Sequence, residues 1–232
     1  MLPRVIATRF DRQLGSGRTK PCIIFAETEH QKEVELVVKV AAGCEFRGLV
    51  CELMAALLAD DLGLPAPEPF LGEITADFAR TVPNREVAAK IEKSCGFNFG
   101  TLKLGSQFST WPISRPIPLA MRALAAEVFA FDGLIQNPDR RWDNPNCLVR
   151  DTELAIYDHD LAFSFLSGII VGKQPWETGG LAFLASRQHR HVFYEGLKGV
   201  PVNFDRLSGA FEIIDEKRLK QYLSAVPEQW QS

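Results

Sequence analysis

The order of predicted strands and helices along the chain indicates an α+β fold built from two unequal lobes. β-rich runs with a single helix come first, and helices interrupted by one hairpin follow. The chain has 232 residues, 46% of them hydrophobic and 24% charged, which is enough for one large core or two smaller ones. We therefore expect an N-lobe over residues 1–74 and a C-lobe over residues 75–232.

Extended runs and one helix define the expected N-lobe. The predicted strands are residues 5–8, 22–26, 34–40 and 70–74. A glycine-containing turn, residues 14–21, separates the first two strands. A helix is predicted over residues 45–62, because Leu49, Leu53 and Ala56 repeat with helical spacing and Gly63 stands at the C-cap position.

The expected C-lobe begins with a stretch, residues 76–118, that shows no clear periodicity. The strongest helical pattern of the chain follows over residues 118–135, and it ends before Pro138. Its apolar stripe consists of Leu124, Val128, Phe131 and Ile135. Two short runs, residues 147–149 and 154–157, predict a hairpin, and two amphipathic helices are expected near residues 187–197 and 216–223.

Composition excludes several classes of function. The formal net charge is -3, so the global charge indicates neither nucleic acid nor an anionic membrane as a partner. The first residues lack a signal-peptide core, and no run approaches the ~20 apolar residues that span a bilayer. The five cysteines show no paired spacing, which favours a reduced, cytoplasmic compartment, and the histidines form no zinc motif.

Two features of the N-lobe are candidates for chemistry. Gly15-Ser16-Gly17 lies between two strands, where paired glycines let the backbone approach phosphate oxygens; a plain hairpin turn is the alternative. Lys39 stands in a run of Val and Leu. A lysine pointing inward needs an acidic partner, and Glu52 on the following helix is a candidate, whereas a solvated strand lysine is the alternative.

Two polar segments of the C-lobe are further candidates. Asp139 and Asn144 lie in an Asn- and Asp-rich loop after the apolar helix, a spacing that suits a base and an oxygen ligand for a metal. A simple Asx-rich turn is the alternative. Asp158 lies in an otherwise apolar context, where a carboxylate is costly unless it is paired or binds a cation.

These features follow the order of protein-kinase catalytic parts: glycine turn, strand lysine, helix glutamate, Asp-x4-Asn loop and hairpin aspartate. The sequence also resembles the HipA-like kinases, bacterial relatives of the protein and phosphoinositide kinases. The resemblance is carried by residues 51–69, 131–149 and 156–165, and it extends over most of the chain. It implies a bilobal protein-kinase-like fold, with a small β-rich N-lobe and a larger, mainly helical C-lobe.

For the C-lobe, the resemblance implies one catalytic position and three candidate metal ligands, two of which are alternatives. Asp139 corresponds to the catalytic-loop aspartate that accepts the proton of the acceptor hydroxyl. Asn144 corresponds to the Mg²⁺-binding asparagine, although Asn146 also matches the family's asparagine before an apolar run, so both remain candidates. Asp158 corresponds to the aspartate that binds Mg²⁺, in an Asp-His-Asp sequence where protein kinases have Asp-Phe-Gly.

For the N-lobe, the resemblance implies an ATP-binding surface. Lys39 would contact the α- and β-phosphates, and Glu52 would position it. Gly15, Ser16 and Gly17 would cover the phosphates, although the third glycine of the usual loop is missing.

The resemblance thus predicts an ATP- and Mg²⁺-dependent phosphotransferase acting on a hydroxyl group, with Ser or Thr of a protein as the expected acceptor. A pseudokinase or nucleotide-binding interaction module, regulated by a partner protein, is one alternative. A small-molecule or lipid kinase is another, because the same machinery serves those acceptors.

Overall fold

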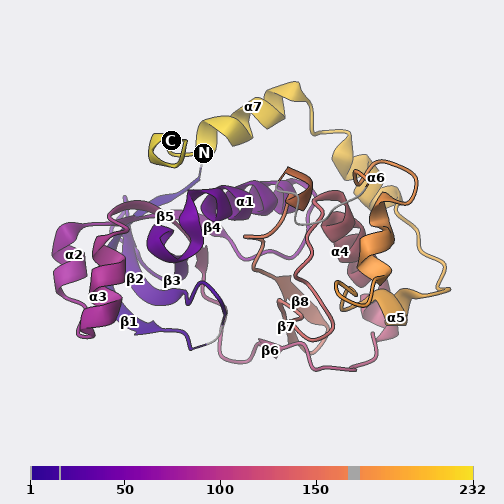
Figure 1. The fold of residues 1–232 in the computed structure, drawn as a ribbon, viewed down its shortest axis with the longest axis horizontal. Helices are drawn as coiled ribbons and strands as arrows, with labels where there is room; N and C mark the ends of the chain where they lie inside the picture. The colour runs from indigo at the N-terminus through magenta and orange to yellow at the C-terminus, as the bar shows by residue number, and fades with distance from the viewer. Residues whose placement is uncertain (1, 16, 167–172, 232) are drawn as a thin grey trace. The chain divides into compact units, whose positions relative to one another are not determined.

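The computed structural model describes residues 2–15, 17–166 and 173–231, which form a mixed α/β structure (Figure 1). The strands are β1 (Arg4–Gln13), β2 (Cys22–Thr28), β3 (Glu33–Lys39), β4 (Pro69–Ile74), β5 (Gly96–Leu102), β6 (Ser109–Thr110), β7 (Cys147–Arg150) and β8 (Glu153–Ile156). The α-helices are α1 (Ala41–Asp61), α2 (Ala76–Arg80), α3 (Arg85–Glu92), α4 (Arg122–Leu134), α5 (Tyr194–Leu197), α6 (Asp205–Phe211) and α7 (Glu216–Ala225). Short 3-10 helices are η1 (Leu119–Met121), η2 (Ser164–Leu166), η3 (Gly180–Ala185) and η4 (Glu228–Trp230).

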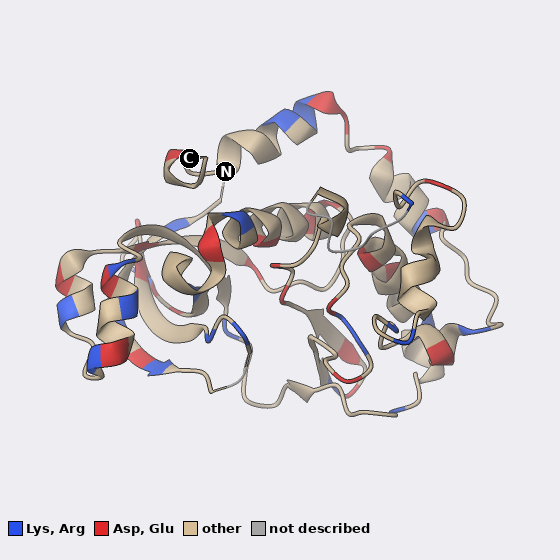
Figure 2. Ribbon diagram, in the orientation of Figure 1, with Lys and Arg blue, Asp and Glu red and all other residues tan. Residues whose placement is uncertain are grey.

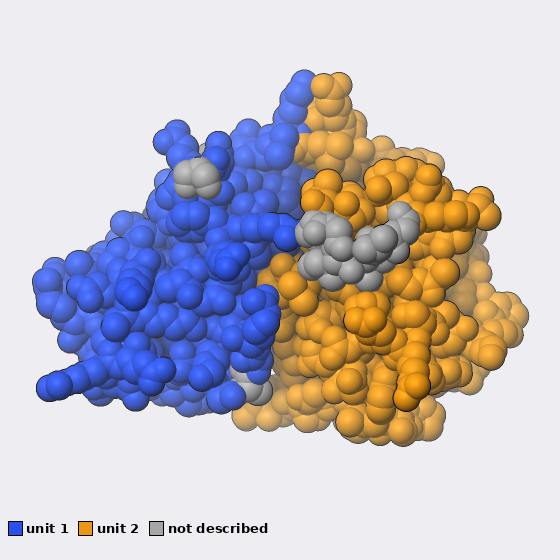
Figure 3. All heavy atoms as spheres, viewed as in Figure 1, with its two compact units in different colours: residues 1–56, 67–104, 220–232 blue, residues 57–66, 105–219 orange. Residues whose placement is uncertain are grey.

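The chain divides into two compact units, which Figure 3 shows in different colours. Unit 1 contains Met1–Ala56, Pro67–Leu104 and Lys220–Ser232. Unit 2 contains Leu57–Ala66 and Gly105–Leu219.

Unit 1 is built on a closed five-stranded barrel in the order β1-β2-β3-β5-β4. All pairings are antiparallel except that of β1 with β4, which closes the barrel in parallel with Arg4 opposite Leu71. Closure leaves no free strand edge in this barrel. Alternate side chains of each strand point inward, so that Leu36 and Val38 of β3 lie in the core beside Ile24 of β2.

Helices α2 and α3 form the connection between β4 and β5. Each begins at a local cap: Oγ1 of Thr75 accepts a hydrogen bond from the N–H of Phe78, and Oδ1 of Asn84 accepts from the N–H of Val87. Buried residues of both helices, including Phe78 and Ile91, belong to the same hydrophobic cluster as the barrel interior. The two helices therefore complete the core of unit 1.

Helix α1 has two parts. Side chains that are distant in the sequence cap its first N–H groups. The N–H of Ala41 donates to Oδ1 of Asn98 at 2.9 Å, and the N–H of Ala42 donates to Oγ of Ser94 at 2.9 Å. Glu45 interrupts the helix with φ 61° and ψ 157°, and the longer part follows it. The stripe expected from the sequence is buried, with Leu49 and Leu53 both inaccessible to solvent.

Unit 2 contains a three-stranded sheet in the order β6-β7-β8 and the apolar helix α4. Strands β7 and β8 form the expected hairpin, in which Cys147 pairs with Ile156. Val128 and Phe131 of α4 are buried, as their spacing predicted.

The observed units differ from the expected lobes in their boundary. Unit 1 extends to Leu104 rather than to residue 74, because β5 belongs to the barrel and pairs with β3 and β4. It also includes Lys220–Ser232, whereas Leu57–Ala66 belong to unit 2. The expectation of a single N-terminal helix was incomplete, since α2 and α3 also belong to unit 1. The helix expected over residues 187–197 is much shorter, with only α5 formed.

No helix in the described part of the chain has both the length and the apolar character needed to cross a bilayer. Acidic and basic residues both occur on α2 and α3, whereas on α7 Glu216 is followed by Lys217, Arg218 and Lys220 (Figure 2).

Candidate functional site

Lys39 and Glu52 form a buried ion pair within unit 1. Lys39 is the last residue of β3 and Glu52 lies in α1, and Nζ of the lysine is 2.5 Å from Oε1 of the glutamate. Only 8% of Lys39 and 3% of Glu52 are exposed. The pair that the sequence predicted is therefore present, and the solvated alternative for Lys39 is wrong.

The glycine turn of unit 1 lies between β1 and β2. The N–H of Leu14 donates to the carbonyl of Pro21 at 2.8 Å, which closes the turn, and Gly17 has φ 88°, where a side chain would be strained. A Cβ atom on Gly15 would contact nothing within 4 Å, so the backbone there is open to an approaching ligand. Ser16, the middle residue of the predicted motif, lies outside the described residues.

The end of this turn is anchored on helix α3. Nζ of Lys90 donates to the carbonyl oxygen of Thr19 at 2.7 Å. Burial lowers the pKa of the Lys90 ammonium below its ordinary value. A Cβ atom on Gly43 would lie 2.7 Å from the same carbonyl, so the close approach of α1 to the turn requires glycine.

In unit 2, the loop after α4 holds the carboxylate of Asp139 with three side chains. Nδ2 of Asn144 and Nδ2 of Asn146 donate to Oδ2 at 2.9 and 3.0 Å. Nη1 of Arg141 donates to Oδ1 at 2.6 Å. The structure thus brings three predicted site residues together, because both candidate asparagines contact the aspartate.

A buried charge network supports this loop from α4. The Asp132 carboxylate accepts a hydrogen bond from Nε of Arg140 at 2.6 Å and one from Nδ2 of Asn137 at 2.8 Å. Oδ1 of Asn137 in turn accepts from the N–H of Asp139 at 3.2 Å. Asp132 and Arg140 are both fully buried, so neither charge is solvated and each depends on its partners.

His191 completes the network. The N–H of Phe193 donates to Nδ1 of His191 at 3.1 Å, so the proton of the neutral ring is on Nε2, which donates to Oδ2 of Asp132 at 3.0 Å. Burial lowers the pKa of His191. Burial alone would raise the pKa of Asp132, but Arg140 and His191 outweigh it and hold that pKa well below its usual range.

Arg140 also connects the loop to both neighbours of Asp158. Its Nη1 donates to the carbonyls of Asn146 and Tyr157, the latter at 3.1 Å, and its Nη2 lies 2.7 Å from Nε2 of His159. Because a guanidinium only donates, Nε2 of His159 is the acceptor. Asp158 itself is half-buried and has φ 64°, a left-handed conformation that is uncommon outside glycine. Such backbone outliers cluster at functional sites.

The oxygen atoms of this region suit a magnesium ion. Since Nδ2 of Asn144 and of Asn146 face Asp139, the amide oxygens Oδ1 point elsewhere, and no described residue donates to them. Asp158 adds a carboxylate, and carboxylate and amide oxygens are ligands that Mg²⁺ accepts. Within the described part of the chain, no group of three His, Cys, Asp or Glu is placed to hold a metal.

The structure thus assembles the predicted residues in two groups, one in each unit. Lys39 and Glu52 are paired in unit 1, and Asp139 is joined to Asn144 and Asn146 in unit 2. Sequence reasoning missed Asp132, Arg140 and His191. A signal for Asp132 was available, because this acidic residue lies four residues after Val128 and so on the same face of the predicted helix as the apolar stripe.

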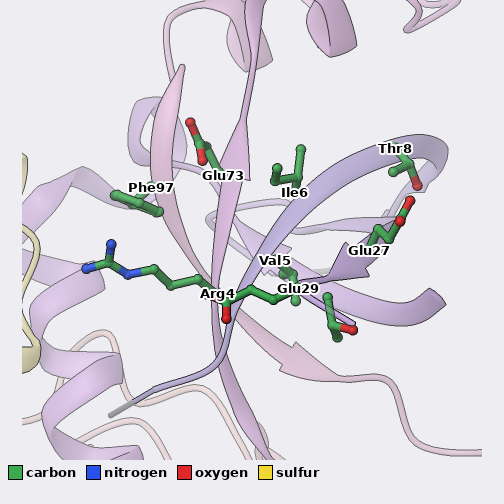
Figure 4. Close-up of a pocket in the computed structure, with 9 residues that line it drawn as sticks. Arg4, Val5, Ile6, Thr8, Glu27, Glu29, Glu73 and Phe97 are labelled. Atoms are coloured by element: carbon green, nitrogen blue, oxygen red, sulfur yellow. The ribbon is translucent and has the colours of Figure 1, made fainter. Parts of the chain in front are cut away.

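Each unit also contains a cavity. One of about 380 Å³ lies beside the barrel, where Arg4 extends past Phe97 and three glutamates, including Glu27 and Glu73, contribute to the lining (Figure 4). The guanidinium carbon of Arg4 is 5.1 Å from the centre of the Phe97 ring. The other cavity, of about 440 Å³, lies in unit 2 and includes Trp142 of the Asp139 loop in its wall.

Comparison with known proteins identifies the family. A family model described as HipA-like kinase matches residues 8–167, which is more than half of the chain. The chain belongs to the HipA-like kinase family. Every predicted site residue of this HipA-like chain falls within the match, whereas His191 and much of the second cavity lie beyond it.

A solved structure is similar in fold to this chain. The crystal structure of a Helicobacter pylori proinflammatory kinase, CtkA, matches with a TM-score of 0.52 at 14% sequence identity. The alignment covers 95% of this chain and 85% of the other. A search of curated proteins gave no match. At this identity the likeness to CtkA concerns the fold alone.

Proposed function

We propose that this HipA-like kinase catalyses ATP- and Mg²⁺-dependent phosphoryl transfer to a hydroxyl group, with Ser or Thr of a protein as the acceptor. The observation that carries the proposal is the arrangement around Asp139, whose carboxylate is oriented by Asn144, Asn146 and Arg141. Phosphoryl transfer needs mainly positioning and charge neutralisation from the protein, and a rigidly held carboxylate beside amide oxygens suits both needs.

The hydrogen bonds of Asp139 support Oδ1 as the atom that accepts the proton in this proposal. Oδ2 receives two amide N–H groups, whereas Oδ1 receives one guanidinium N–H and keeps an acceptor site. As the acceptor oxygen attacks the γ-phosphorus, its proton moves to Oδ1 of Asp139. The new P–O bond forms, the bond from the γ-phosphorus to the β–γ bridging oxygen breaks, and ADP leaves.

The other residues have binding roles in this proposal. Lys39, oriented by Glu52, binds the α- and β-phosphates, and the turn from Gly15 to Gly17 covers them. Asp158 and an asparagine, Asn144 or Asn146, hold Mg²⁺, which when bound neutralises charge on the phosphates.

Transfer of radiolabelled γ-phosphate to a mixture of protein acceptors tests the proposal. Asp139→Asn should lower the rate by about 10²- to 10⁴-fold and leave Mg·ATP binding intact, because the amide cannot accept the proton. Asp143→Asn is the matched control, since Asp143 also pairs with Arg141 but is more exposed. Equal rates for wild type and Asp139→Asn would contradict the proposal, and labelling of lipids or small molecules alone would change the acceptor class.

One observation favours a nucleotide-binding module without transferase activity. Nη1 of Arg141 is ion-paired with Oδ1 of Asp139, the atom assigned to accept the proton. If this pair persists when nucleotide binds, Mg·ATP would raise the melting temperature without any phosphate transfer. In that case, Arg141→Gln should restore measurable phosphate transfer. Under the main proposal, the same substitution should not raise the rate of transfer.

A further inference from the structure

The cavity of about 440 Å³ in unit 2 shares a wall with the loop that carries Asp139. Trp142 belongs to that wall. Its backbone N–H donates to the carbonyl of Arg190, another residue that lines the cavity, at 3.0 Å. The N–H of Val192 donates to the carbonyl of Arg140 at 3.1 Å. Trp142 follows Asp139 by three residues, so the two Cα atoms are at most about 11 Å apart. A peptide with its hydroxyl at Asp139 could therefore place a nearby side chain in this cavity.

Arg115 gives the cavity a fixed positive charge. Its guanidinium carbon lies 4.9 Å from the centre of the Trp111 ring, and its Nη2 donates to the carbonyl of Asp151 at 3.0 Å. Trp111 is only 2% exposed and packs edge-on against Phe193, so the ring is a rigid support. Among the described residues, no carboxylate contacts this guanidinium, and its charge is therefore oriented but not neutralised.

A second arginine and an exposed indole complete the cavity. Arg190 lies 3.1 Å from Glu195, but the two side chains are 39% and 61% exposed, and such solvated pairs exchange partners at little cost. His191 adds no positive charge, because burial lowers its pKa and both ring nitrogens are engaged within the protein. Trp142 is 49% exposed, which leaves an apolar surface beside the two cations.

We propose that this cavity binds an acidic side chain of the acceptor protein, close in sequence to the hydroxyl that is phosphorylated. The inference rests on the proposed function for the identity of the partner. A guanidinium with free N–H groups matches the planar carboxylate, and an arginine held in place loses little entropy on binding. Because the whole chain has a net charge of -3, a local positive cavity would select acidic segments that the rest of the surface does not attract.

The barrel cavity of unit 1 provides a contrast. Glu27, Glu29 and Glu73 line it, and its arginine, Arg4, lies against Phe97. Two arginines and one glutamate line the cavity of unit 2. Charge complementarity therefore assigns an acidic ligand to the second cavity alone.

Binding of labelled peptides to the full chain without nucleotide tests the inference. The probes are eleven-residue peptides with a central serine, in which the flanking positions are Asp and Glu, or their neutral counterparts Asn and Gln. We expect the acidic peptide to bind about tenfold more tightly at low salt, with the preference lost near 1 M NaCl. Equal affinity for the two peptides would overturn the inference.

Variants locate the binding to the cavity. Arg115→Gln and, separately, Arg190→Gln should each weaken acidic-peptide binding about three- to tenfold. Arg115→Lys should weaken this binding less than Arg115→Gln, because it keeps the charge. Arg122→Gln is the matched control, because it removes one charge from the exposed start of α4 and should bind like wild type. Wild-type affinity in both cavity variants would overturn the inference. So would equal competition by a single-stranded oligonucleotide of the same charge, since it would indicate a general anion site.

Phosphorylation of the same peptides separates this inference from the proposed function. Equal phosphorylation of the acidic and the neutral peptides would overturn this inference but not the proposed function. Peptides that bind in an Arg115-dependent way but receive no phosphate would contradict the proposed function and leave the acidic ligand class supported.

Discussion

Nε of Arg140 lies 2.6 Å from Oδ2 of Asp132, and both side chains are completely buried. The same guanidinium reaches the carbonyl of Tyr157 and the ring of His159, which flank Asp158. One buried cation thus connects helix α4, the loop of Asp139 and the segment of Asp158. A buried ion pair is a weak source of net stability, but it can specify one geometry, because every alternative leaves a charge without its partner.

Removing the anion of this pair should be costly. We expect Asp132→Ala to lower the free energy of unfolding by about 3–5 kcal/mol, because it leaves the guanidinium of Arg140 buried without its carboxylate. Urea denaturation measures the change. Glu153→Ala is the control, since its partner Arg150 is partly exposed and the loss there should stay below about 1 kcal/mol. Similar losses in the two variants would contradict the structural role assigned to Asp132.

Arg140 should act as a positioning residue for the proposed Mg²⁺ ligands. Arg140→Lys keeps the charge but cannot contact Asp132, Tyr157 and His159 at the same time. We expect the apparent affinity for Mg²⁺ in the transferase assay to fall about 10- to 100-fold, as for other residues that orient metal ligands. The same change at Arg218, which pairs with Asp61, should leave the Mg²⁺ dependence unaltered. A purely structural role would instead lower the melting temperature at constant Mg²⁺ affinity.

The pair of Lys39 and Glu52 allows stability and binding to be separated. Lys39→Met should destabilise unit 1 by a few kcal/mol, because Glu52 is then buried without its lysine. Lys39→Met combined with Glu52→Gln should recover much of that loss, since no buried carboxylate remains without the cation. Calorimetry should show that Mg·ATP binding is not recovered in the double variant. Recovery of both properties would show that Lys39 has no role toward the nucleotide.

Protonation of His191 should make the protein acid-sensitive. Its pKa in the folded chain lies below the ordinary value of 6.5, so the unfolded chain binds this proton more readily. The free energy of unfolding should therefore fall as pH drops below about 6.5, by up to about 1.4 kcal/mol per pH unit. The depressed pKa of Asp132 acts in the same direction only below the ordinary carboxyl value of 3.8. Urea denaturation across pH 5–8 measures the slope.

A variant isolates the contribution of this histidine. His191→Asn lacks the titrating ring, so its stability should change less between pH 7 and pH 5 than that of the wild type. His30→Asn, in an exposed turn, should retain the wild-type slope. An unchanged slope in His191→Asn would assign the acid sensitivity to other groups.

Local patterns predicted the parts of the site that depend on neighbouring residues in the chain. The stripe of Val128 and Phe131 predicted α4, and the two β-rich runs after it predicted the hairpin of β7 and β8. An inward lysine needs an acidic partner, which led to Glu52. These predictions succeeded because periodicity and the cost of burying a charge are expressed within short segments.

Other parts could not be predicted because their causes are distant in the sequence. Helix α1 begins at Ala41 because the side chains of Ser94 and Asn98 cap its first N–H groups. The N–H and the carbonyl of Phe97 in β5 are both bound by the side-chain amide of Gln229. No local signal near Ala41 or Phe97 indicates these partners.

The amino-acid sequence of this protein determines three properties by itself. They are the order of the candidate site residues along the chain, the apolar stripes of the main helices and the membership of a kinase family. Tertiary structure alone decided that β5 joins the barrel between β3 and β4, and that Arg140, to which the sequence assigned no role, is buried against Asp132. The physical reason is that a charge can be buried only where several distant segments supply its hydrogen bonds together. Such a set of partners exists only in the folded chain.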